Sequence, residues 1–469
     1  MPLILGTNSI KDTGYDVANS LRFNSGSSDS LNRSASAGNR KTFTISSWIK
    51  PSTTGYGVFF SGKSASTSYA NVQFPNGSSK LQFTEYQNGD TINLETNRLF
   101  RDISAWWHVV IAVDTTQGTA SNRIKLYLNG VQETSFATET YPSQNADTVF
   151  NSSSSTHRIG CNNDADGGFF NGYIAETVLI DGSQLAPDQF GEFDSDSGIW
   201  KPIDVSGLTF GNNGFYLDFE DSSNLGNDAN GGTDFGETNL AATDQSTDTC
   251  TNNSCTMNPL NIPVSNKPTF SEGNLKTVTS SSGSGRFGGT STFGVTQGKW
   301  YVEAKATVGS TYSRNSIGVS YNPAEMARNN SDNTLTDTSY AWGWDSSGGD
   351  VYHDSSVVVN YATYATGDIC QIFLDLDNHK LYYGKNGSLQ SSTGISLDTG
   401  ETYFIAQIDR TGGSDVSTFE FNFGSPIYAI SSSNTDGEYG NFEYSTTITG
   451  DGASKTFKAL NTKNLAEFG

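Results

Sequence analysis

The chain has 469 residues, enough for two or three domains, with 49 acidic and 27 basic side chains and a formal net charge of −22. Acidic and basic residues are interspersed along the chain, which indicates a solvated surface rather than an acidic tail. The excess of carboxylates disfavours nucleic acid and anionic membrane as partners, because phosphate groups are bound by clustered Lys and Arg.

The hydrophobic fraction of 34% is low for a globular protein, but aromatic residues make up 12% of the chain. Aromatic side chains bury the most apolar area per residue, so this composition predicts a folded chain. The four Cys residues, at positions 161, 250, 255 and 370, are too sparse for a disulfide framework. We expect Cys370, within an apolar run, to be buried, and we leave open whether Cys250 and Cys255 pair.

The segment at 1–6 lacks a basic region and has too short an apolar core for a signal peptide. No apolar stretch approaches the ~20 residues that a membrane-spanning helix needs. We therefore expect a chain that is made in a cytoplasm and is not inserted into a membrane.

Strand patterns recur along the whole chain, taken here in order. Residues 109–113 form a continuous apolar run, typical of a strand covered on both faces. Residues 300–306 and 419–423 alternate between apolar and polar side chains, the pattern of a half-buried strand. The dipeptides Asn129-Gly130 and Asn386-Gly387 each follow a strand-like run and predict two-residue hairpin turns.

Helix patterns are confined to two short segments, 187–193 and 322–328, the second with Asn322 as a cap and Pro323 at the first helical position. Neither is long enough to form a helical layer. The sequence thus predicts an all-β chain of two β-sandwich, jelly-roll-like domains joined by a long irregular connector. The predicted boundaries are an N-terminal arm at 1–17, a first sandwich at 18–205, the connector at 206–268, a second sandwich at 269–460 and a C-terminal tail at 461–469.

The first sandwich resembles laminin-G-like, concanavalin-type jelly rolls over roughly 180 residues. The motifs that carry the resemblance are LRF at 21–23, FTISSWIK at 43–50, WHVVIAV at 107–113, KLYLNG at 125–130 and GYIAE at 172–176.

The second sandwich resembles a SPRY domain in the order and spacing of its motifs. These are GKWYVE at 298–303, SIGVS at 316–320, AWGWD at 341–345 with YH at 352–353, GD at 367–368, FLDLD at 373–377 and FNFG at 421–424.

The pairing of the two modules, with LGTNSIKDTGY at 5–15 and DTCTNN at 248–253, is similar to surface proteins of marine short-tailed phages. The resemblance implies a virion protein, such as a tail fibre, a head decoration or a knob, whose loops bind a host-surface glycan or protein. The alternative is a lectin or a concanavalin-type glycoside hydrolase of a marine bacterium.

Concanavalin-type folds include hydrolases with paired carboxylates, so closely spaced Asp and Glu residues are the candidate catalytic groups. The nearest string, Glu192-Phe193-Asp194-Ser195-Asp196, lacks the last Glu of a Glu-x-Asp-x-Glu motif and lies in no apolar alternation, which favours a polar turn. The four His residues, at 108, 157, 353 and 379, show no zinc-ligand spacing. We expect His108, beside the apolar run, to be a core or sheet-edge residue, and we predict no catalytic residue, no cofactor and no enzyme activity.

Two further sets of residues are candidates for binding sites. Asn163, Asp164 and Asp166 offer the oxygen ligands that calcium prefers, but clusters of Asn, Asp and Gly are typical of turns, so a rim metal stays the minor alternative. Trp342 and Trp344 are placed to stack on a sugar ring, but their alternation directs both rings to one side of a strand, which favours the core.

The last expectation concerns assembly. The arm at 1–17 begins with the apolar residues Leu3, Ile4 and Leu5, which we expect to pack against a sister subunit or another virion protein. Homo-oligomers are the usual outcome for soluble assemblies, and a trimer is expected from the phage resemblance. The alternative is that the arm folds back as an edge strand of its own jelly roll.

Overall fold

A computed structural model describes residues 12–263, 267–278, 286–307, 314–326, 338–410, 417–432 and 437–469. Over these residues the chain is nearly all β, which confirms the predicted fold class. It divides into two compact units, which we call the first unit (Asp12–Asn253) and the second unit (Ser254–Gly469). In the described part of the chain, no helix has the length and apolar character that crossing a bilayer requires.

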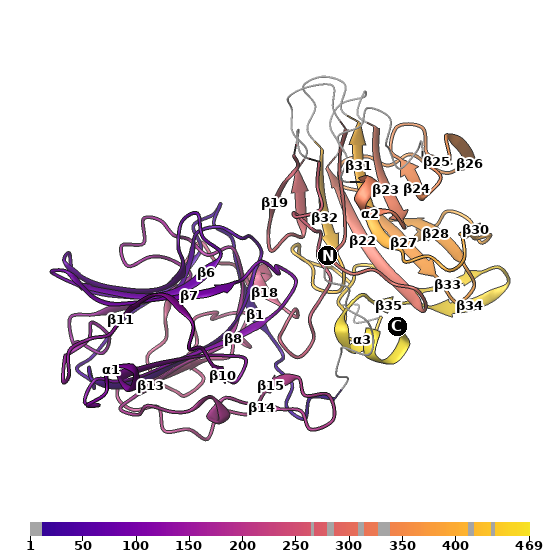
Figure 1. Ribbon diagram of the computed structural model, residues 1–469. Coiled ribbons are helices and arrows are strands. Elements are labelled where there is room, and N and C mark those ends of the chain that lie inside the picture. Colours follow the sequence, from indigo (N-terminus) through magenta and orange to yellow (C-terminus); the bar gives the residue numbers. More distant parts are fainter. Residues whose placement is uncertain are drawn as a thin grey trace. The chain divides into compact units, whose positions relative to one another are not determined.

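The first unit is a sandwich of two antiparallel sheets, drawn in indigo to magenta in Figure 1. Across the first sheet the order is β10 (Val131–Gln132), β9 (Ile124–Leu128), β8 (Trp107–Asp114), β3 (Thr42–Pro51), β13 (Gly172–Asp181), β1 (Ser20–Phe23) and β18 (Gln245–Ser246), with β16 (Phe215–Leu217) paired to β13. Across the second sheet it is β11 (Phe136–Thr140), β7 (Asp90–Leu99), β6 (Lys80–Gln87), β5 (Ser68–Phe74), β4 (Gly57–Ala65), β12 (Thr156–Ile159), β2 (Ser30–Ser34) and β17 (Gly236–Thr238). The remaining elements are α1 (Ala120–Arg123), the 3₁₀ turns η2 (Pro187–Gln189) and η3 (Ala242–Asp244), and the hairpin β14 (Gly191–Phe193) and β15 (Trp200–Pro202).

Apolar side chains from the inner faces of both sheets form one core, rich in Phe. The outer face of the first sheet is also covered, because residues 185–217 lay a second apolar cluster, with Phe190 and Phe210, over β13. The apolar run at 109–113 lies in β8, where Val109 and Ile111 join the inner core and Val110 joins the outer cluster. This strand is thus buried on both faces, as its sequence predicts.

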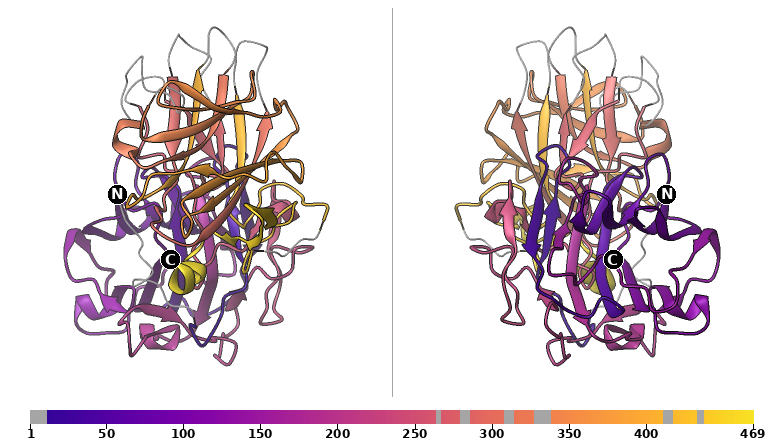
Figure 2. Two further views of the ribbon diagram at one scale, coloured as in Figure 1. Left: turned by 90° about the vertical axis from the view of Figure 1, so that its right-hand side faces the viewer. Right: turned by 90° about the vertical axis from the view of Figure 1, so that its left-hand side faces the viewer.

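The second unit contains a large sheet, a smaller six-stranded sheet and a hairpin (Figure 2). The large sheet has the order β19 (Thr269–Ser271), β20 (Lys276–Val278), β32 (Thr418–Asn422), β22 (Lys299–Thr307), β27 (Ile369–Asp375), β28 (Lys380–Lys385) and β29 (Ser388–Leu389), with β30 (Ile395–Ser396) paired to β28 and β35 (Lys458–Ala459) to β22. The six-stranded sheet has the order β21 (Arg286–Thr290), β31 (Phe404–Arg410), β23 (Arg314–Ser320), β24 (Ala341–Asp345), β25 (Asp350–His353) and β26 (Ser356–Asn360). The hairpin is β33 (Thr447–Gly450) and β34 (Ala453–Thr456), and the helices are α2 (Pro323–Met326) and α3 (Thr462–Phe468).

Both predicted Asn-Gly turns are present. Asn129 and Gly130 join β9 to β10 with φ angles of 45° and 78°, and Asn386 and Gly387 join β28 to β29 with 49° and 79°. Two consecutive positive φ angles are what a tight turn between twisted antiparallel strands requires, and Asn and Gly tolerate them. The helix predicted at 322–328 is present as α2, where Asn322 Oδ1 accepts the Glu325 N–H; Ala327 and Arg328 lie outside the described residues. In the segment 187–193, only η2 is helical, and β14 follows it.

The domain boundaries differ from those predicted. Residues 206–253, predicted as part of an irregular connector, belong to the first unit and supply β16, β17 and β18 to its sheets. At the other end of the chain, the predicted tail at 461–469 forms α3, whose Leu465 is 2% exposed in the core of the second unit. Both segments carry too few apolar residues in sequence for a periodic pattern.

Buried ion pairs hold the segment 206–253 against the first three strands. Arg22 of β1 pairs with Asp244 at 3.0 Å, Arg33 of β2 with Asp228 at 3.4 Å, and Lys50 of β3 with Asp248 at 2.7 Å. We call these contacts the three-pair seam. A charge that is left unpaired in an apolar interior is strongly destabilising, so each cation requires its carboxylate.

His108 and His157 are both buried in the first unit. His108 accepts a hydrogen bond from Trp200 Nε1 at Nδ1 (3.0 Å) and contacts Ser46 Oγ at 2.8 Å through Nε2. This is the hydrogen-bonded core position that its sequence context predicts. His157 is fully buried among aromatic rings, with Phe60 and Phe150 at centroid distances of 5.9 and 5.8 Å. Burial lowers the pKa of each imidazole to about 3.

Because the folded state keeps His157 neutral, it binds fewer protons than the unfolded chain between about pH 3 and pH 6.5. The stability contributed by this group is therefore present above pH 6.5 and is lost as the pH falls. In His157→Phe, the phenyl ring fills the same aromatic site and cannot be protonated. We predict that, when the pH falls from 7 to 5, wild type loses about 2 kcal/mol more of its free energy of unfolding than this variant does. Urea unfolding at both pH values measures this difference. The variant His379→Asn, in a turn of the second unit, is the control, and an equal pH dependence in all three proteins would contradict the prediction.

Candidate functional site

A groove of about 420 Å³ opens on the second unit, a volume typical of small-ligand sites. One side is built from strands β24, β25 and β26, and the other from the loop at 391–398, which includes β30. The lining residues are Trp342, His353, Val358, Val359, Tyr361, Ser391, Thr393, Gly394, Ile395, Ser396, Leu397 and Asp398.

Two stacked rings line the strand side of the groove. His353 lies parallel to Trp342 at a centroid distance of 4.1 Å and an interplanar angle of 8°. His353 Nδ1 lies 3.1 Å from the carbonyl oxygen of Ala341 on the neighbouring strand. A carbonyl oxygen only accepts, so Nδ1 carries a proton and the ring is fixed in orientation. The stack gives the groove a rigid aromatic wall.

The loop at 391–398 is anchored through its backbone and through Ser396 Oγ, which accepts a hydrogen bond from Lys380 Nζ at 3.1 Å. Asp451 accepts the Gly394 N–H at 3.2 Å, Lys380 Nζ donates to the Gly394 carbonyl at 3.4 Å, and the Leu397 N–H donates to the His379 carbonyl at 2.9 Å. Gly394 itself is required, because a Cβ there would lie 2.7 Å from the ring of Tyr382. The exposed Thr393, Ser396 and Asp398 are therefore presented on a fixed loop.

Exposed apolar side chains border the groove. β26 is the last strand of the six-stranded sheet, and its Val357 and Val358 are 51% and 45% exposed. An apolar edge strand is unusual on a soluble protein, because it invites association. The groove thus combines apolar valines, an aromatic wall, hydroxyl groups and one carboxylate, the mixture expected where a ligand is bound by shape and a few hydrogen bonds.

The two tryptophans of the AWGWD motif lie in the core, as predicted. Trp342 is 2% exposed and Trp344 is fully buried, and both belong to the main apolar cluster of the second unit. Only the edge of Trp342 is left for the groove, because His353 covers one of its faces. Cys370 is also buried in this cluster, and all four Cys side chains are free thiols.

The carboxylates at 192–196 lie in and after the hairpin strand β14. Glu192 and Asp194 both pair with Lys201 of the facing strand, at 3.3 and 3.5 Å. Asp194 also accepts the backbone N–H groups of Asp196 and Ser197, which closes a tight turn. This is the polar turn that the sequence predicts.

The oxygen-rich set at 163–166 is held by protein groups. Asp164 pairs with Lys63, Asn163 donates to Asp164 at 2.8 Å, and Asp166 accepts from Asn162 at 2.9 Å. Across the described ranges of the chain, no three His, Cys, Asp or Glu side chains gather in an arrangement suited to a metal ion.

The predicted anchor residues Leu3, Ile4 and Leu5 lie outside the described residues. The rest of the predicted arm is packed. Tyr15 reaches Glu176 of β13, and Val17 is buried beside Trp48, with its N–H donating to Thr251 Oγ1 at 3.1 Å. Residues 12–17 are therefore part of the first unit.

Glu176 is a buried carboxyl in a strained backbone position. It lies in a bulge of β13 with φ of 47°, and its Oε2 accepts hydrogen bonds from Tyr216 at 2.8 Å and Tyr15 at 3.4 Å. Burial raises its pKa to about 8, and the nearby carboxylates of Asp218 and Glu220 add to the rise. Nothing in the sequence around GYIAE distinguishes this residue from an exposed strand Glu.

The folded state holds the Glu176 proton to a higher pH than the unfolded chain does. Its stabilising contribution is therefore complete below about pH 4 and is lost as the pH rises towards 8. Glu176→Gln mimics the neutral carboxyl. We predict that, when the pH rises from 6 to 8, wild type loses about 2 kcal/mol more of its unfolding free energy than this variant does. Denaturant titrations at both pH values test this, with the exposed Glu192→Gln as the matched control. Parallel pH profiles for wild type and Glu176→Gln would show that the carboxyl is already ionised in the fold.

The groove was only partly foreseeable from the sequence. His353 and the two tryptophans were noted, but Val358, Tyr361 and the loop at 391–398 were not. The available signal was the run of three valines at 357–359, β-branched residues beside polar neighbours on a short strand.

Two parts of the chain match known domain families. Residues 24–188 match the model of the concanavalin A-like lectin/glucanases superfamily, and residues 299–406 match the SPRY domain. No curated protein sequence matches the chain.

Solved structures with similarity to the chain include the SPRY domain of human HERC1, at 17% identity and a TM-score of 0.30, which covers 35% of this chain and 96% of its own. The SAP-like pentraxin from Limulus polyphemus has 17% identity and a TM-score of 0.29, covering 37% of this chain and 81% of its own. Domain 4 of the arabinanase AbnA from Geobacillus stearothermophilus has 19% identity and a TM-score of 0.26, covering 32% and 65%. The two family matches alone place a concanavalin-like domain in the first unit and a SPRY domain in the second, and these units are called the first and second domains below. This arrangement fits a binding or recognition role.

Proposed function

From a concanavalin-like domain followed by a SPRY domain, we propose that the chain is a structural and recognition protein on the surface of a phage particle, with the SPRY groove as its ligand site. The observation that carries the recognition part is the groove, with its fixed aromatic wall, its apolar edge strand and its anchored polar loop. The virion part is supported by the resemblance of residues 5–15 and 248–253 to surface proteins of marine short-tailed phages.

The proposal includes that the chain is not an enzyme. Among the described residues that line the groove, Asp398 alone bears a carboxylate. Hydrolysis of a glycosidic bond usually requires two carboxyl groups on opposite sides of the bond. The second candidate function is that of a lectin of a marine bacterium. Such a lectin would bind its ligand in the same groove but would not be part of a virion.

The ligand class proposed is a host-surface glycan or protein. Hydroxyl groups of Ser391, Thr393 and Ser396 supply donors and acceptors, while Val358 and Tyr361 supply apolar contact. Binding sites of this kind depend on a few central side chains, so single changes at the centre have large effects.

We predict that Val358→Asp weakens binding to host cells or to an array glycan roughly tenfold to a hundredfold, because it places a charge on the apolar wall. Val131→Asp is the matched control, since Val131 is 58% exposed on a strand of the first domain and is remote in sequence from the groove. Binding curves for the three proteins decide the matter. If Val358→Asp binds as wild type does, the groove is not the site, and release of a cleaved product would contradict the non-enzymatic proposal.

The proposed anchor is the segment Met1–Lys11 with Leu3, Ile4 and Leu5, acting on a sister chain or on another virion protein, and the proposed oligomer is a trimer. Because residues 12–17 are packed in the first domain, the matching deletion ends at Lys11. We predict that cryo-electron microscopy finds the wild-type chain at fixed positions on particles, whereas the 1–11 deletion keeps its thermal midpoint and fails to load. Light scattering should give three times the 50.3 kDa chain mass for wild type. Particles that lack the protein would refute the virion proposal, and normal loading of the deletion would refute the anchor.

A further inference from the structure

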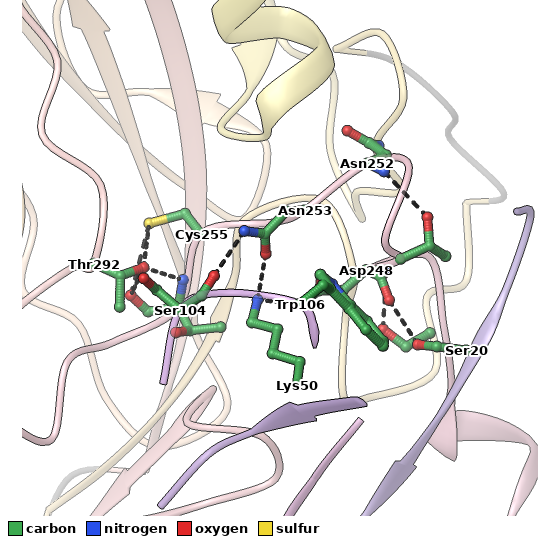
Figure 3. Close-up of polar contacts among 12 residues, drawn as sticks. Ser20, Lys50, Ser104, Trp106, Asp248, Asn252, Asn253, Cys255 and Thr292 are labelled. Atoms are coloured by element: carbon green, nitrogen blue, oxygen red, sulfur yellow. Dashed lines mark hydrogen bonds and ion pairs between the residues drawn. The ribbon is translucent and has the colours of Figure 1, made fainter. Parts of the chain in front are cut away.

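A lysine, an asparagine and an aspartate meet inside the first domain, at the end of the three-pair seam (Figure 3). Lys50 Nζ lies 2.7 Å from Asp248 Oδ2 and 2.7 Å from Asn253 Oδ1. Lys50 and Asp248 are each 1% exposed. The lysine amine thus contacts both an amide carbonyl and a carboxyl, the groups that an amide-exchange reaction requires, and Asn253 is half-buried.

The carbonyl group of the Asn253 side chain faces the lysine. Its Nδ2 donates to the Ser104 carbonyl at 2.7 Å, so its carbonyl side is turned towards Lys50. The orientation follows from chemistry, because the Ser104 oxygen only accepts and the lysine only donates. The amide carbon lies one C=O bond, about 1.2 Å, beyond the contacted oxygen. Nζ and Cγ of Asn253 are therefore at most about 3.9 Å apart.

Asp248 is oriented to exchange a proton with the lysine. Trp106 Nε1 donates to Asp248 Oδ1 at 3.1 Å, which directs the other carboxyl oxygen to Lys50. The backbone around it is also fixed, since Ser20 Oγ donates to the Asp248 carbonyl at 2.6 Å and the Asp248 N–H donates to Ser246 Oγ at 3.1 Å.

Aromatic rings enclose the reacting groups. Lys50 Nζ lies 5.5 Å from the ring centroid of Tyr173, its register partner on β13, and Tyr173 packs against Trp106 at 6.3 Å.

We propose that Lys50 and Asn253 become joined by an intramolecular isopeptide bond, with Asp248 as the proton carrier. The Lys50 ammonium passes a proton to Asp248, and the neutral Nζ attacks Cγ of Asn253. The bond between Cγ and Nδ2 then breaks, with protons delivered to the leaving nitrogen through Asp248. The products are an amide between Nζ and Cγ and one ammonium ion, and Asp248 returns to the carboxylate. No oxidant, reductant or cofactor is needed.

The consequence is a covalent link between β3 and the last residue of the first domain. The bond fixes the end of the segment 206–253 to β3. Without it, this segment is held against the strands by ion pairs and other non-covalent contacts. Closing a loop of about two hundred residues restricts the unfolded chain, so the linked protein should unfold at a higher temperature than the unlinked one.

Intact mass spectrometry of the purified full chain tests the proposal. The expected mass is lower than the sequence mass by one ammonia, and proteolysis should yield a branched peptide that joins the segments carrying Lys50 and Asn253. Lys50→Met, Asp248→Asn and Asn253→Ala should each restore the full mass expected for the variant. Asn252→Ala removes the adjacent amide and should keep the ammonia loss.

The competing outcomes are distinct. Succinimide formation at Asn129-Gly130 or Asn386-Gly387 also releases ammonia, but it leaves no branched peptide and persists in Lys50→Met. Loss of water in place of ammonia would indicate a bond to Asp248 and would overturn the assignment of Asn253. A wild-type chain at the full sequence mass, without a branched peptide, would show that Lys50 forms only an ion pair, and this result does not depend on how the variants fold.

Discussion

The contact between Lys50 and Asp248 is the constraint on which the first domain depends. Removing an ammonium and a carboxylate from water costs several kcal/mol per ion, so neither group can be buried unless the other is in place. In the unlinked chain that the structure describes, both are 1% exposed, and the ammonium is also bound by Asn253 and faces the ring of Tyr173. The segment that carries Asp248 must therefore lie against β3 whenever β3 is in the sheet.

The same need for a partner charge applies to Arg33 and Asp228, another pair of the three-pair seam. Arg33 donates to the Asn213 carbonyl at 2.6 Å and lies 4.8 Å from the ring centroids of both Phe215 and Phe235. Its partner Asp228 also accepts the Tyr216 N–H at 3.0 Å, so the pair fixes the backbone beside β16. A stretch rich in Gly, Asn and Asp is thus held by charge and hydrogen bonds where apolar periodicity is absent. Truncating one partner would leave an uncompensated charge and would destabilise the domain by about 3–5 kcal/mol.

This seam explains what the sequence could and could not predict. Local rules located the strands at 109–113 and 300–306 and both Asn-Gly hairpins, because alternation and positive φ angles are properties of neighbouring residues. The segment 206–253 was predicted as a connector because its contacts are to residues about two hundred positions away, and ion pairing leaves no periodic pattern. Lys50, within FTISSWIK, has the appearance of an exposed strand residue and is buried instead. The strand at 300–306 is buried on both faces for a related reason, since Tyr301 is covered by Phe442 and Phe457 from the end of the chain.

In the groove of the second domain, the residues that anchor the structure are largely separate from the exposed residues that line it. Its lining comes from β24–β26 and from a loop some forty residues later, so a single sequence gives no sign that they meet. What fixes the loop is Gly394, Leu397 and the backbone bonds to Lys380, His379 and Asp451, with one side-chain bond from Lys380 to Ser396 and no bond that needs the side chain of Thr393. The exposed lining can therefore change while the anchoring stays constant, which is how loops on a rigid sandwich acquire different ligands.

The aromatic stack of Trp342 and His353 is a fixed part of the groove, because Trp342 belongs to the core and cannot vary without loss of packing. Under the proposed function, ligand specificity resides in the loop hydroxyls, Asp398 and the valines of β26, and ligand affinity in the wall that the core holds fixed.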